Sequence, residues 1–525
     1  MNLGLYTARS ARFWPDRPAI KFRERSLTFL ELERRSNRLA HALLGLGLVR
    51  GDRVAVVSAN RPELVELECA LYKAGLVKVA LNARLAPAEL ADALANSDPT
   101  ACLAAPAHQA HVDAVDLPGL RHRIALQDAS GGAVAPDAGA TWLDYEALLV
   151  TASDAHIAVD MHADDLAVLH YTSGSTGRLK AAMQTVGNRM ASLRKVVMGR
   201  MRCGPGDTLG LSGPITHASG MFMQPCLYQG ATVLLHERFD PEALLRSIGQ
   251  HRVTMTYMVP AMMHTLMADP ALRRNDLSSL RLLSYGAAPM SPERIREAWA
   301  CFGPVLAQGY GAGETTGGLV GLSIEDHSAA IYGGRPELLG SCGRPFGESD
   351  VQVLGDGDVP VQGDAIGEIC VRGPDVFAGY WRAPELTSEA IVGGWLRTGD
   401  LARVDHEGYL HIVDRKKEMV VSGGFNVYPT EVESVLARHP AVYEVSVVGV
   451  PDERWGEAVK AVIVLRGGTQ ATETELIEFC RGTLADFKRP KSVDFVDELP
   501  KSANGKLSRK AVRERYWQGR ERRVN

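Results

Sequence analysis

Residues 171–180, YTSGSTGRLK, constrain this chain more than any other stretch. They join an apolar run at 166–171 to a short loop of Ser, Thr and Gly that ends in a basic residue. The apolar run predicts a buried strand, and Gly174 and Gly177 allow the backbone to turn its amide groups toward an anion. We therefore predict a phosphate-binding loop directly after a buried strand.

Side chains of the same loop add donors and a positive charge. The pattern differs from the Walker loop, because Lys180 does not directly follow a glycine and no Ser or Thr follows it. A solvated turn leading into the pattern at 186–198 would explain the loop equally well by itself. The donors are Thr172, Ser173, Ser175 and Thr176.

Four motifs follow the loop in order: GYGAGETTG at 309–317, WLRTGD at 395–400, VDRKKE at 413–418 and PKSANGK at 500–506. With them, the chain resembles the adenylate-forming superfamily, specifically the acyl-CoA synthetases, which are AMP-binding acid:CoA ligases. The resemblance runs from the first helices to the last lysine motif. The loop departs from the family pattern at Leu179, where proline is usual, and at Ala181, where glycine is usual.

The length and composition of the chain limit the classes of protein to which it can belong. A chain of 525 residues is too long for one core and suggests roughly three or four units. A net charge of −4 lacks the basic excess that nucleic-acid binding needs. The eight cysteines form no CxxC pair, which favours a reducing cytoplasm over a disulfide framework. No apolar run is long enough for a signal peptide or a membrane span. The oligomeric state stays open, a homo-oligomer included.

Alternating helix and strand patterns predict an α/β fold. Helical periodicity at 27–46 and 64–74 alternates with strand-like runs at 53–60 and 77–82. Period-two runs later in the chain predict a small β subdomain at about 345–413. We predict a large N-terminal domain of wound α/β layers, residues 1–415, which contains this subdomain. A small, mobile α+β domain, residues 416–525, follows, and the resemblance makes it a lid that carries a catalytic lysine.

A histidine and a methionine suggest one wall of an acyl pocket. His217 lies between an expected strand and an apolar cluster that includes Met221. A histidine in such a setting is more often a core residue than a catalyst. The resemblance instead makes His217 a residue that lines and gates the acyl pocket.

Further methionines suggest an apolar substrate. Met258 and Met262 are core residues by default, or they line the acyl pocket, which by resemblance Gly309 also borders. No Arg or Lys lies at 253–269, so no local counter-ion for a second carboxylate is found there. We expect an apolar fatty or aromatic monocarboxylate rather than a dicarboxylic acid.

Two predicted strands end in Gly-rich turns, where ligands bind in open α/β sheets. Without the resemblance, Asp400 is a turn residue and Arg415 belongs to a charged hairpin. The resemblance places the backbone of Gly286, Ala287 and Ala288 beside adenine and Tyr310 stacked on it. The resemblance also makes Gly311 and Thr315 nucleotide-binding residues. It assigns Asp400 and Arg415 to the ribose.

Glu314 is the candidate metal ligand. The resemblance makes it the carboxylate that holds Mg²⁺ on the ATP phosphates, a suitable ligand for a hard cation. The family's usual threonine before this glutamate is Gly313 here. We expect Thr315 or Thr316 to supply the missing hydroxyl.

Several residues define the remaining catalytic machinery. In PKSANGK, Asn504 and Gly505 predict a tight turn that presents Lys506. The resemblance makes Lys180, Lys506 and Glu314 the catalytic residues. It makes Lys417 the hinge, and it lines the pantetheine tunnel for CoA with Gly423 and Gly424.

These assignments predict an ATP-dependent acid:CoA ligase that uses Mg²⁺, with a small carboxylic acid, ATP and CoA as partners and no nucleic acid. The enzyme would form acyl-AMP and pyrophosphate, and would then transfer the acyl group to CoA. One alternative is a ligase that loads a carrier protein's phosphopantetheine arm. Another is a non-catalytic nucleotide or acyl-AMP-binding protein, suggested by Gly313 and Leu179. The retained residues Lys180, Glu314 and Lys506 argue against this second alternative.

Overall fold

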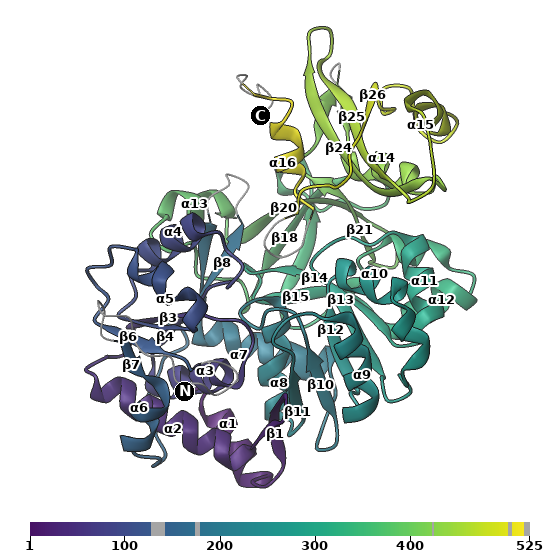
Figure 1. Ribbon diagram of the computed structural model, residues 1–525. Coiled ribbons are helices and arrows are strands. Elements are labelled where there is room, and N and C mark those ends of the chain that lie inside the picture. The colour runs from purple at the N-terminus through teal and green to yellow at the C-terminus, as the bar shows by residue number, and fades with distance from the viewer. Residues whose placement is uncertain (128–141, 174–178, 423–424, 502–506, 519–525) are drawn as a thin grey trace.

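The computed structural model describes residues 1–127, 142–173, 179–422, 425–501 and 507–518. These residues build a large α/β body and a smaller C-terminal lobe, which stands above the body in Figure 1. Seven of the predicted site residues lie outside the described residues. They are Gly174, Ser175, Thr176, Gly177, Gly423, Gly424 and Lys506.

One sheet of the body carries the candidate phosphate loop. Its described strands lie in the order β7-β6-β5-β3-β4-β8-β9, all parallel except the final hairpin of β8 with β9. The predicted strand at 166–171 is therefore confirmed, and Lys180 lies on β9 opposite Thr172 of β8. The bounds are β3 Arg53–Val57, β4 Val77–Ala80, β5 Ala101–Ala104, β6 His122–Ala125, β7 Trp142–Asp144, β8 Leu166–Ser173 and β9 Leu179–Thr185.

A second sheet of the body carries the two predicted Gly-rich turns. Its described strands lie in the order β16-β15-β14-β13-β12-β10-β11-β1-β2, and the central run from β14 to β1 is parallel. The wound α/β fold is thus confirmed. The bounds are β1 Pro18–Phe22, β2 Arg25–Thr28, β10 Thr208–Leu211, β11 Thr232–Leu235, β12 Met255–Met258, β13 Leu282–Gly286, β14 Leu306–Ala312, β15 Gly317–Leu322 and β16 Arg344–Pro345.

Helices of the body begin where the sequence provides caps or prolines. Thr28 caps helix α2, since its hydroxyl and backbone amide pair with Glu31 in a capping box, and Pro260 opens α10. The bounds are α1 Leu5–Phe13, α2 Phe29–Gly45, α3 Pro62–Ala74, α4 Pro87–Ser97, α5 Pro106–Asp113, α6 Tyr145–Thr151, α7 Val186–Lys195, α8 Met223–Tyr228, α9 Pro241–His251, α10 Pro260–Ala268, α11 Pro292–Phe302, α12 Ile324–Tyr332 and α13 Pro384–Ala390. Short helical turns span Val196–Arg200, Ala218–Phe222, Pro270–Arg274, Pro336–Gly340 and Asp356–Asp358.

Helix α3 is buried along its whole length, although it carries charged residues. An unpaired charge inside a protein is costly, so each of these side chains needs a counter-charge. The surrounding chain provides them: Arg61 pairs with Glu63, Arg35 with Glu66, Lys78 with Glu68, and Glu33 with Lys73. Helix α3 is therefore held by ion pairs as well as by apolar contacts.

The predicted β subdomain is a separate sheet in the order β17-β18-β20-β19, with β21 paired to β20. The lobe has its own sheet in the order β23-β22-β25-β24, with β26 paired to β25. The boundary between residues 415 and 416 stays a prediction. The bounds are β17 Asp350–Leu354, β18 Gly367–Arg372, β19 Ile391–Val392, β20 Trp395–Val404, β21 Leu410–Arg415, β22 Val420–Ser422, β23 Phe425–Val427, β24 Val442–Asp452, β25 Gly456–Leu465, β26 Ser492–Phe495, α14 Pro429–Leu436, α15 Glu473–Phe479 and α16 Arg509–Glu514.

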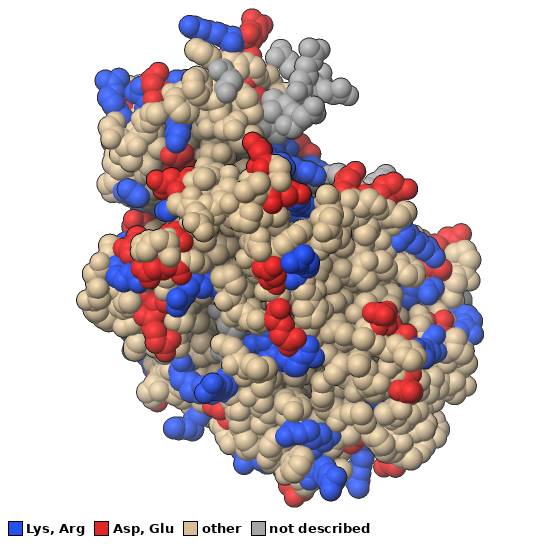
Figure 2. Space-filling view, turned by 180° about the vertical axis from the view of Figure 1, so that it is seen from behind, with Lys and Arg blue, Asp and Glu red and all other residues tan. Residues whose placement is uncertain are grey.

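The surface is mixed in charge. Figure 2 shows basic and acidic side chains interspersed over the back of the molecule. Of the helices that the structure describes, none combines the length and the apolar character needed to span a membrane.

Candidate active site

The turn between β14 and β15 lies where the two body sheets meet the β subdomain. Three donors from other elements hold its successive carbonyl groups. Gln184 Nε2 of β9 donates to Gly313 O at 2.8 Å, and the backbone N–H of Phe377 donates to Glu314 O at 2.8 Å. Lys195 Nζ of α7 donates to Thr315 O at 3.0 Å. The position of Glu314 is therefore set by segments that are far apart in the sequence.

The carboxylate of Glu314 lies beside the end of β8, the strand that leads into the candidate phosphate loop. Its Oε1 accepts hydrogen bonds from Thr172 Oγ1 at 3.2 Å and from the Tyr380 hydroxyl at 2.9 Å. Lys180 Nζ lies 5.2 Å from the centre of the Tyr380 ring. Burial, together with the charge of Glu314, raises the pKa of Tyr380, so this phenol stays a hydrogen-bond donor. Three predicted residues, from β8, β9 and the turn, thus gather at one point.

The space around Gly313 is already filled. A methyl carbon placed on Gly313 would lie 2.7 Å from His170 Cδ2 and 2.7 Å from Thr172 Cγ2. These two side chains occupy the room that a threonine at this position would need. Thr172 also donates to Glu314, so a hydroxyl is supplied from β8.

The structure does not support the expectation that Thr315 or Thr316 replaces the missing hydroxyl. The Thr315 hydroxyl accepts from Ala312 N at 2.8 Å and donates to Gly317 O at 2.8 Å. The Thr316 hydroxyl donates to Asp375 O at 2.8 Å. Both side chains are buried and stabilise the turn.

A second group links the body to the segment that leads into the lobe. Tyr310 of β14 donates its hydroxyl to Asp400 Oδ2 at 2.6 Å, and Arg415 Nε lies 2.9 Å from Asp400 Oδ1. Asp400 and Arg415 face each other across β20 and β21. The negative charge of Asp400 raises the pKa of Arg415. The residues predicted to bind adenine and ribose are therefore in mutual contact.

The end of β13 brings backbone close to β14. A methyl carbon on Gly286 would lie 2.1 Å from Gly309 O, and one on Gly311 would lie 2.2 Å from Gly317 O. Ala287, with φ of 66°, adopts the left-handed conformation that is uncommon for a residue with a side chain. The close approaches explain why positions 286 and 311 have no side chain. The adenine contacts of Gly286, Ala287 and Ala288 stay a prediction.

The predicted acyl-pocket residues fall into two places. The His217 ring lies 5.4 Å from the His170 ring, and Met221 Cε lies 2.9 Å from where a methyl carbon on Gly317 would be. His217 and Met221 are therefore close to the Glu314 turn. Met258 is instead buried in the core among the helices outside the second sheet, where Met262 also packs. Their packing favours the core interpretation.

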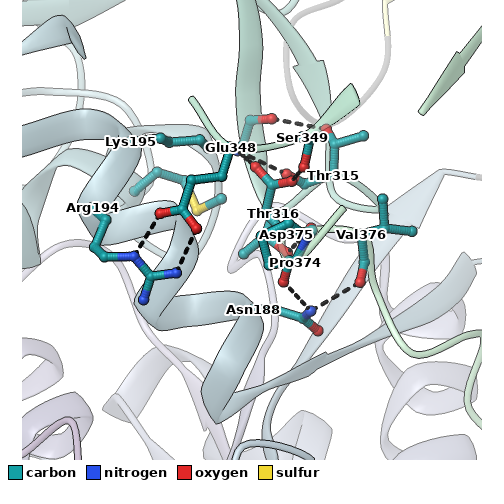
Figure 3. Close-up of polar contacts among 12 residues, drawn as sticks. Asn188, Arg194, Lys195, Thr315, Thr316, Glu348, Ser349, Pro374, Asp375 and Val376 are labelled. Atoms are coloured by element: carbon teal, nitrogen blue, oxygen red, sulfur yellow. Dashed lines mark hydrogen bonds and ion pairs between the residues drawn. The ribbon is translucent and has the colours of Figure 1, made fainter. Parts of the chain in front are cut away.

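The sequence analysis missed several residues that hold the candidate site together, because their partners are remote in sequence. Figure 3 shows Lys195 paired with the Asp375 carboxylate, which also accepts from the Ser349 hydroxyl. Asn188 Nδ2 donates to Pro374 O at 2.8 Å and to Val376 O at 2.9 Å. This buried network holds α7 against the segment that precedes Tyr380. A single lysine in the sequence does not show that it is buried or structural. Its role becomes clear only when its carboxylate partner is known.

The predicted hinge lies beside a buried cluster of charges. Arg509 Nη1 of α16 lies 3.0 Å from Asp414 Oδ1 and 2.6 Å from Glu418 Oε2. Arg509 Nε donates to Glu433 Oε1 at 2.9 Å. Burial raises the pKa of Asp414, whereas Arg509 opposes that rise. This cluster flanks Lys417 on both sides in sequence.

Comparisons with known proteins identify the family of the chain. The family model of the AMP-binding enzyme matches residues 7–381, and that of the AMP-binding enzyme C-terminal domain matches residues 431–506. A feruloyl-CoA synthase of Amycolatopsis sp is 39% identical, covering 98% of this chain and 99% of its own. A medium/long-chain-fatty-acid–CoA ligase of Mycobacterium tuberculosis is 35% identical, covering 97% and 89%. The structure of the amide bond synthetase McbA from Marinactinospora thermotolerans superposes with a TM-score of 0.87 at 32% identity, covering 98% and 100%.

The chain therefore belongs to the AMP-binding, adenylate-forming enzyme family. Within this family it is an acyl-CoA synthetase, an AMP-forming ligase that joins a carboxylic acid to CoA with the use of ATP.

The buried pair of Figure 3 generates a stability prediction. The side chains of Lys195 and Asp375 are 2% and 3% exposed, so Lys195→Met leaves a buried carboxylate without its cation. We expect a loss of about 3 to 5 kcal/mol in the free energy of unfolding, measured by urea denaturation. The control is Arg194→Met, since Arg194 and Glu348 are 43% and 46% exposed and such pairs contribute about 1 kcal/mol or less. Equal losses in the two variants would contradict the assignment.

Proposed function

We propose that the site at the β14–β15 turn performs both half-reactions of the ligase. The observation that carries this proposal is that Thr172 and Tyr380 both donate to the Glu314 carboxylate, while Lys180 lies over the ring of the same Tyr380. This group combines a cation, hydroxyl donors and a carboxylate at the carboxyl ends of strands, which suits a bound polyphosphate.

ATP would lie between this group and the pair of Asp400 with Arg415. Lys180 and the loop after β8 bind the phosphates, and Asp400 and Arg415 bind the ribose hydroxyls. Tyr310 stacks on the adenine, whose edge meets the backbone at Gly286, Ala287 and Ala288. The close approach of β13 and β14 at Gly286 supports a purely backbone contact there.

The residues present fit a magnesium ion. The described residues contain no group of three or more His, Cys, Asp or Glu that could hold a metal by themselves. Mg²⁺ is commonly bound by one or two carboxylates together with substrate phosphates, and Glu314 supplies such a carboxylate. When bound, the ion neutralises charge that develops on the phosphate oxygens.

In the first half-reaction, a carboxylate oxygen of the acid attacks the α-phosphorus of ATP. The bond from this phosphorus to the bridging oxygen breaks, so pyrophosphate leaves with the electron pair and acyl-AMP remains. Lys180 and Lys506 stabilise negative charge on the reacting oxygens.

In the second half-reaction, the lobe turns about Lys417 and withdraws Lys506. Gly423 and Gly424 then border the path by which the CoA thiol reaches the acyl carbonyl. The sulfur forms the thioester bond, the acyl–phosphate bond breaks, the thiol proton goes to solvent, and AMP leaves.

The acid itself is proposed only as a class. The relatives named above act on feruloyl and fatty acyl groups, and Met221 offers apolar surface near the turn. We propose an acid with an apolar body, fatty or aromatic. A cytoplasmic location and the oligomeric state remain predictions from the sequence.

A screen of carboxylic acids tests the function. With ATP and Mg²⁺, we expect acid-dependent pyrophosphate release, and with CoA also AMP and a thioester in equal amounts. Nucleotide binding without pyrophosphate release from any acid would favour the non-catalytic alternative. Pyrophosphate release without transfer to free CoA would favour a carrier protein as the acceptor.

Glu314→Gln should weaken the use of magnesium, because an amide oxygen carries no formal charge for the metal. We expect roughly a tenfold or greater loss in apparent magnesium affinity, read from initial rates over a magnesium titration. Glu325→Gln, at an exposed position of α12, is the matched control and should behave as the unaltered protein does. A uniform loss of rate with unchanged magnesium dependence would count against the ligand role.

Lys506→Ala and Gly424→Leu should separate the half-reactions. Removing a charge-stabilising donor costs on the order of 10²–10³ in rate, so Lys506→Ala should nearly stop acyl-AMP formation. This variant should still convert supplied acyl-AMP and CoA to thioester. Gly424→Leu should do the opposite, because its side chain obstructs the pantetheine path. Parallel loss of both half-reactions in both variants would exclude rotation about Lys417.

A further inference from the structure

A buried arginine lies behind Met221. Arg189 of α7 has a side chain only 11% exposed. Its Nη1 lies 3.1 Å from the Met221 sulfur and 3.4 Å from Gln184 Oε1, and its Nε donates to the Tyr72 hydroxyl at 3.2 Å. A thioether is a weak acceptor, and 3.4 Å is long for a hydrogen bond. Nη1 therefore lacks a strong acceptor.

The neighbouring carboxylate is also incompletely paired. Glu68 Oε2 accepts from Lys78, but Oε1 has no hydrogen-bond partner among the described residues. Arg189 Nη2 lies 3.8 Å from this oxygen, beyond hydrogen-bond distance. Although burial works against its charge, Lys78, Arg189 and the side-chain amide of Gln224 hold the pKa of Glu68 below its usual value. A buried, ionised oxygen without a donor is costly and calls for one.

This cluster is connected to the active-site turn by two side chains. The side-chain oxygen of Gln184 contacts Arg189, and the side-chain N–H of Gln184 donates a hydrogen bond to Gly313 O. Met221 contacts Arg189 through its sulfur, while its terminal methyl group points to Gly317 at the start of β15. Met221 thus separates the guanidinium from the turn that holds Glu314. A displacement of this flexible side chain would open Arg189 to a ligand held there.

We propose that the acid carries a hydroxyl group at the end remote from its carboxylate, and that Arg189 and Glu68 recognise this hydroxyl. The hydroxyl oxygen takes the place of the Met221 sulfur as acceptor for Arg189. Its proton is donated to Glu68 Oε1. This assignment rests on the proposed function, because it places the acyl group between His217 and Met221.

A hydroxyl group fits the cluster better than the other ends an acid can have. It accepts from Arg189 and donates to Glu68, so both incomplete groups are satisfied. A second carboxylate would accept from Arg189 but would face the charge of Glu68. An apolar end would leave the guanidinium with a sulfur acceptor and the carboxylate oxygen without a donor. The sequence window at 253–269 could not reveal Arg189, which comes from another part of the chain.

The test compares matched acids by kcat/KM for pyrophosphate release: 4-hydroxycinnamate, cinnamate and 4-carboxycinnamate, together with a long ω-hydroxy fatty acid and its unsubstituted analogue. We expect the hydroxylated member of at least one pair to be preferred by about tenfold or more, since its absence leaves buried polar groups unpaired. Equal values within both pairs, or preference for the dicarboxylate, would overturn the proposal. This comparison needs no variant and does not depend on a variant's folding.

Two variants assign the preference to named residues. Arg189→Met should reduce the preference to about twofold or less while unsubstituted acids are still converted. Met221→Leu removes the competing sulfur acceptor without a change of charge, so it should keep or increase the preference. Proportional loss for all acids in Arg189→Met would mean a merely structural role, unless Met221→Leu shifts the preference. A preference that Met221→Leu abolishes would contradict the assignment to Arg189.

Failure of the two proposals can be told apart. No pyrophosphate release from any acid would remove the proposed function, and this inference with it. Release from unsubstituted acids without a hydroxyl preference would remove only the inference.

Discussion

The turn at Gly313–Thr316 is the constraint on which the site depends. Its carbonyl groups are held by β9, by α7 and by the segment before Tyr380. None of these donors is adjacent to the turn in sequence, so Glu314 is positioned only when both sheets and the β subdomain have assembled. The geometry of the candidate site therefore depends on the assembled body and not on a local motif.

Buried charge is used in two ways in this protein. Around α3 and in the pair of Lys195 with Asp375, cations and carboxylates match and stabilise the packing of elements. Around Arg189 they do not match, because two cations share one carboxylate and one of its oxygens has no donor. The matched ion pairs hold elements of the fold against one another. We attribute the unmatched charges around Arg189 to the recognition of a ligand.

The sequence predicted what depends on local pattern and failed where partners are remote. The strand at 166–171 and the helix at 27–46 were predicted from an apolar run and from apolar periodicity, and both are present. Thr315 was expected to contact phosphate because its hydroxyl lies close in sequence to position 313, where the family usually has a threonine. The structure instead uses it inside the turn, since His170 and Thr172 from β8 fill the space beside Gly313.

The same limit applies to substrate specificity. A search for counter-ions within one stretch of sequence found none, yet Arg189 reaches Met221 from α7. The roles of Tyr380 and Asp375 likewise follow only from contacts in the structure. Tyr380 donates to Glu314, and Asp375 pairs with Lys195. Such contacts join segments that no periodicity relates, and only packing reveals them.

The charge cluster beside the predicted hinge bears on the energetics of turnover. Asp414 precedes Lys417, whereas Arg509 and Thr430, which both donate to Asp414, follow it. The proposed rotation about Lys417 would carry both donors away, while Glu418 and Glu433 would move with Arg509. Asp414, now fully buried, would then keep only the Arg415 N–H, 2.7 Å from its Oδ1, and its other oxygen would need water or a proton. The proposed rotation would thereby couple opening of the lobe to water entry or proton uptake at one aspartate, so solvent conditions would bias which half-reaction the enzyme is ready to perform.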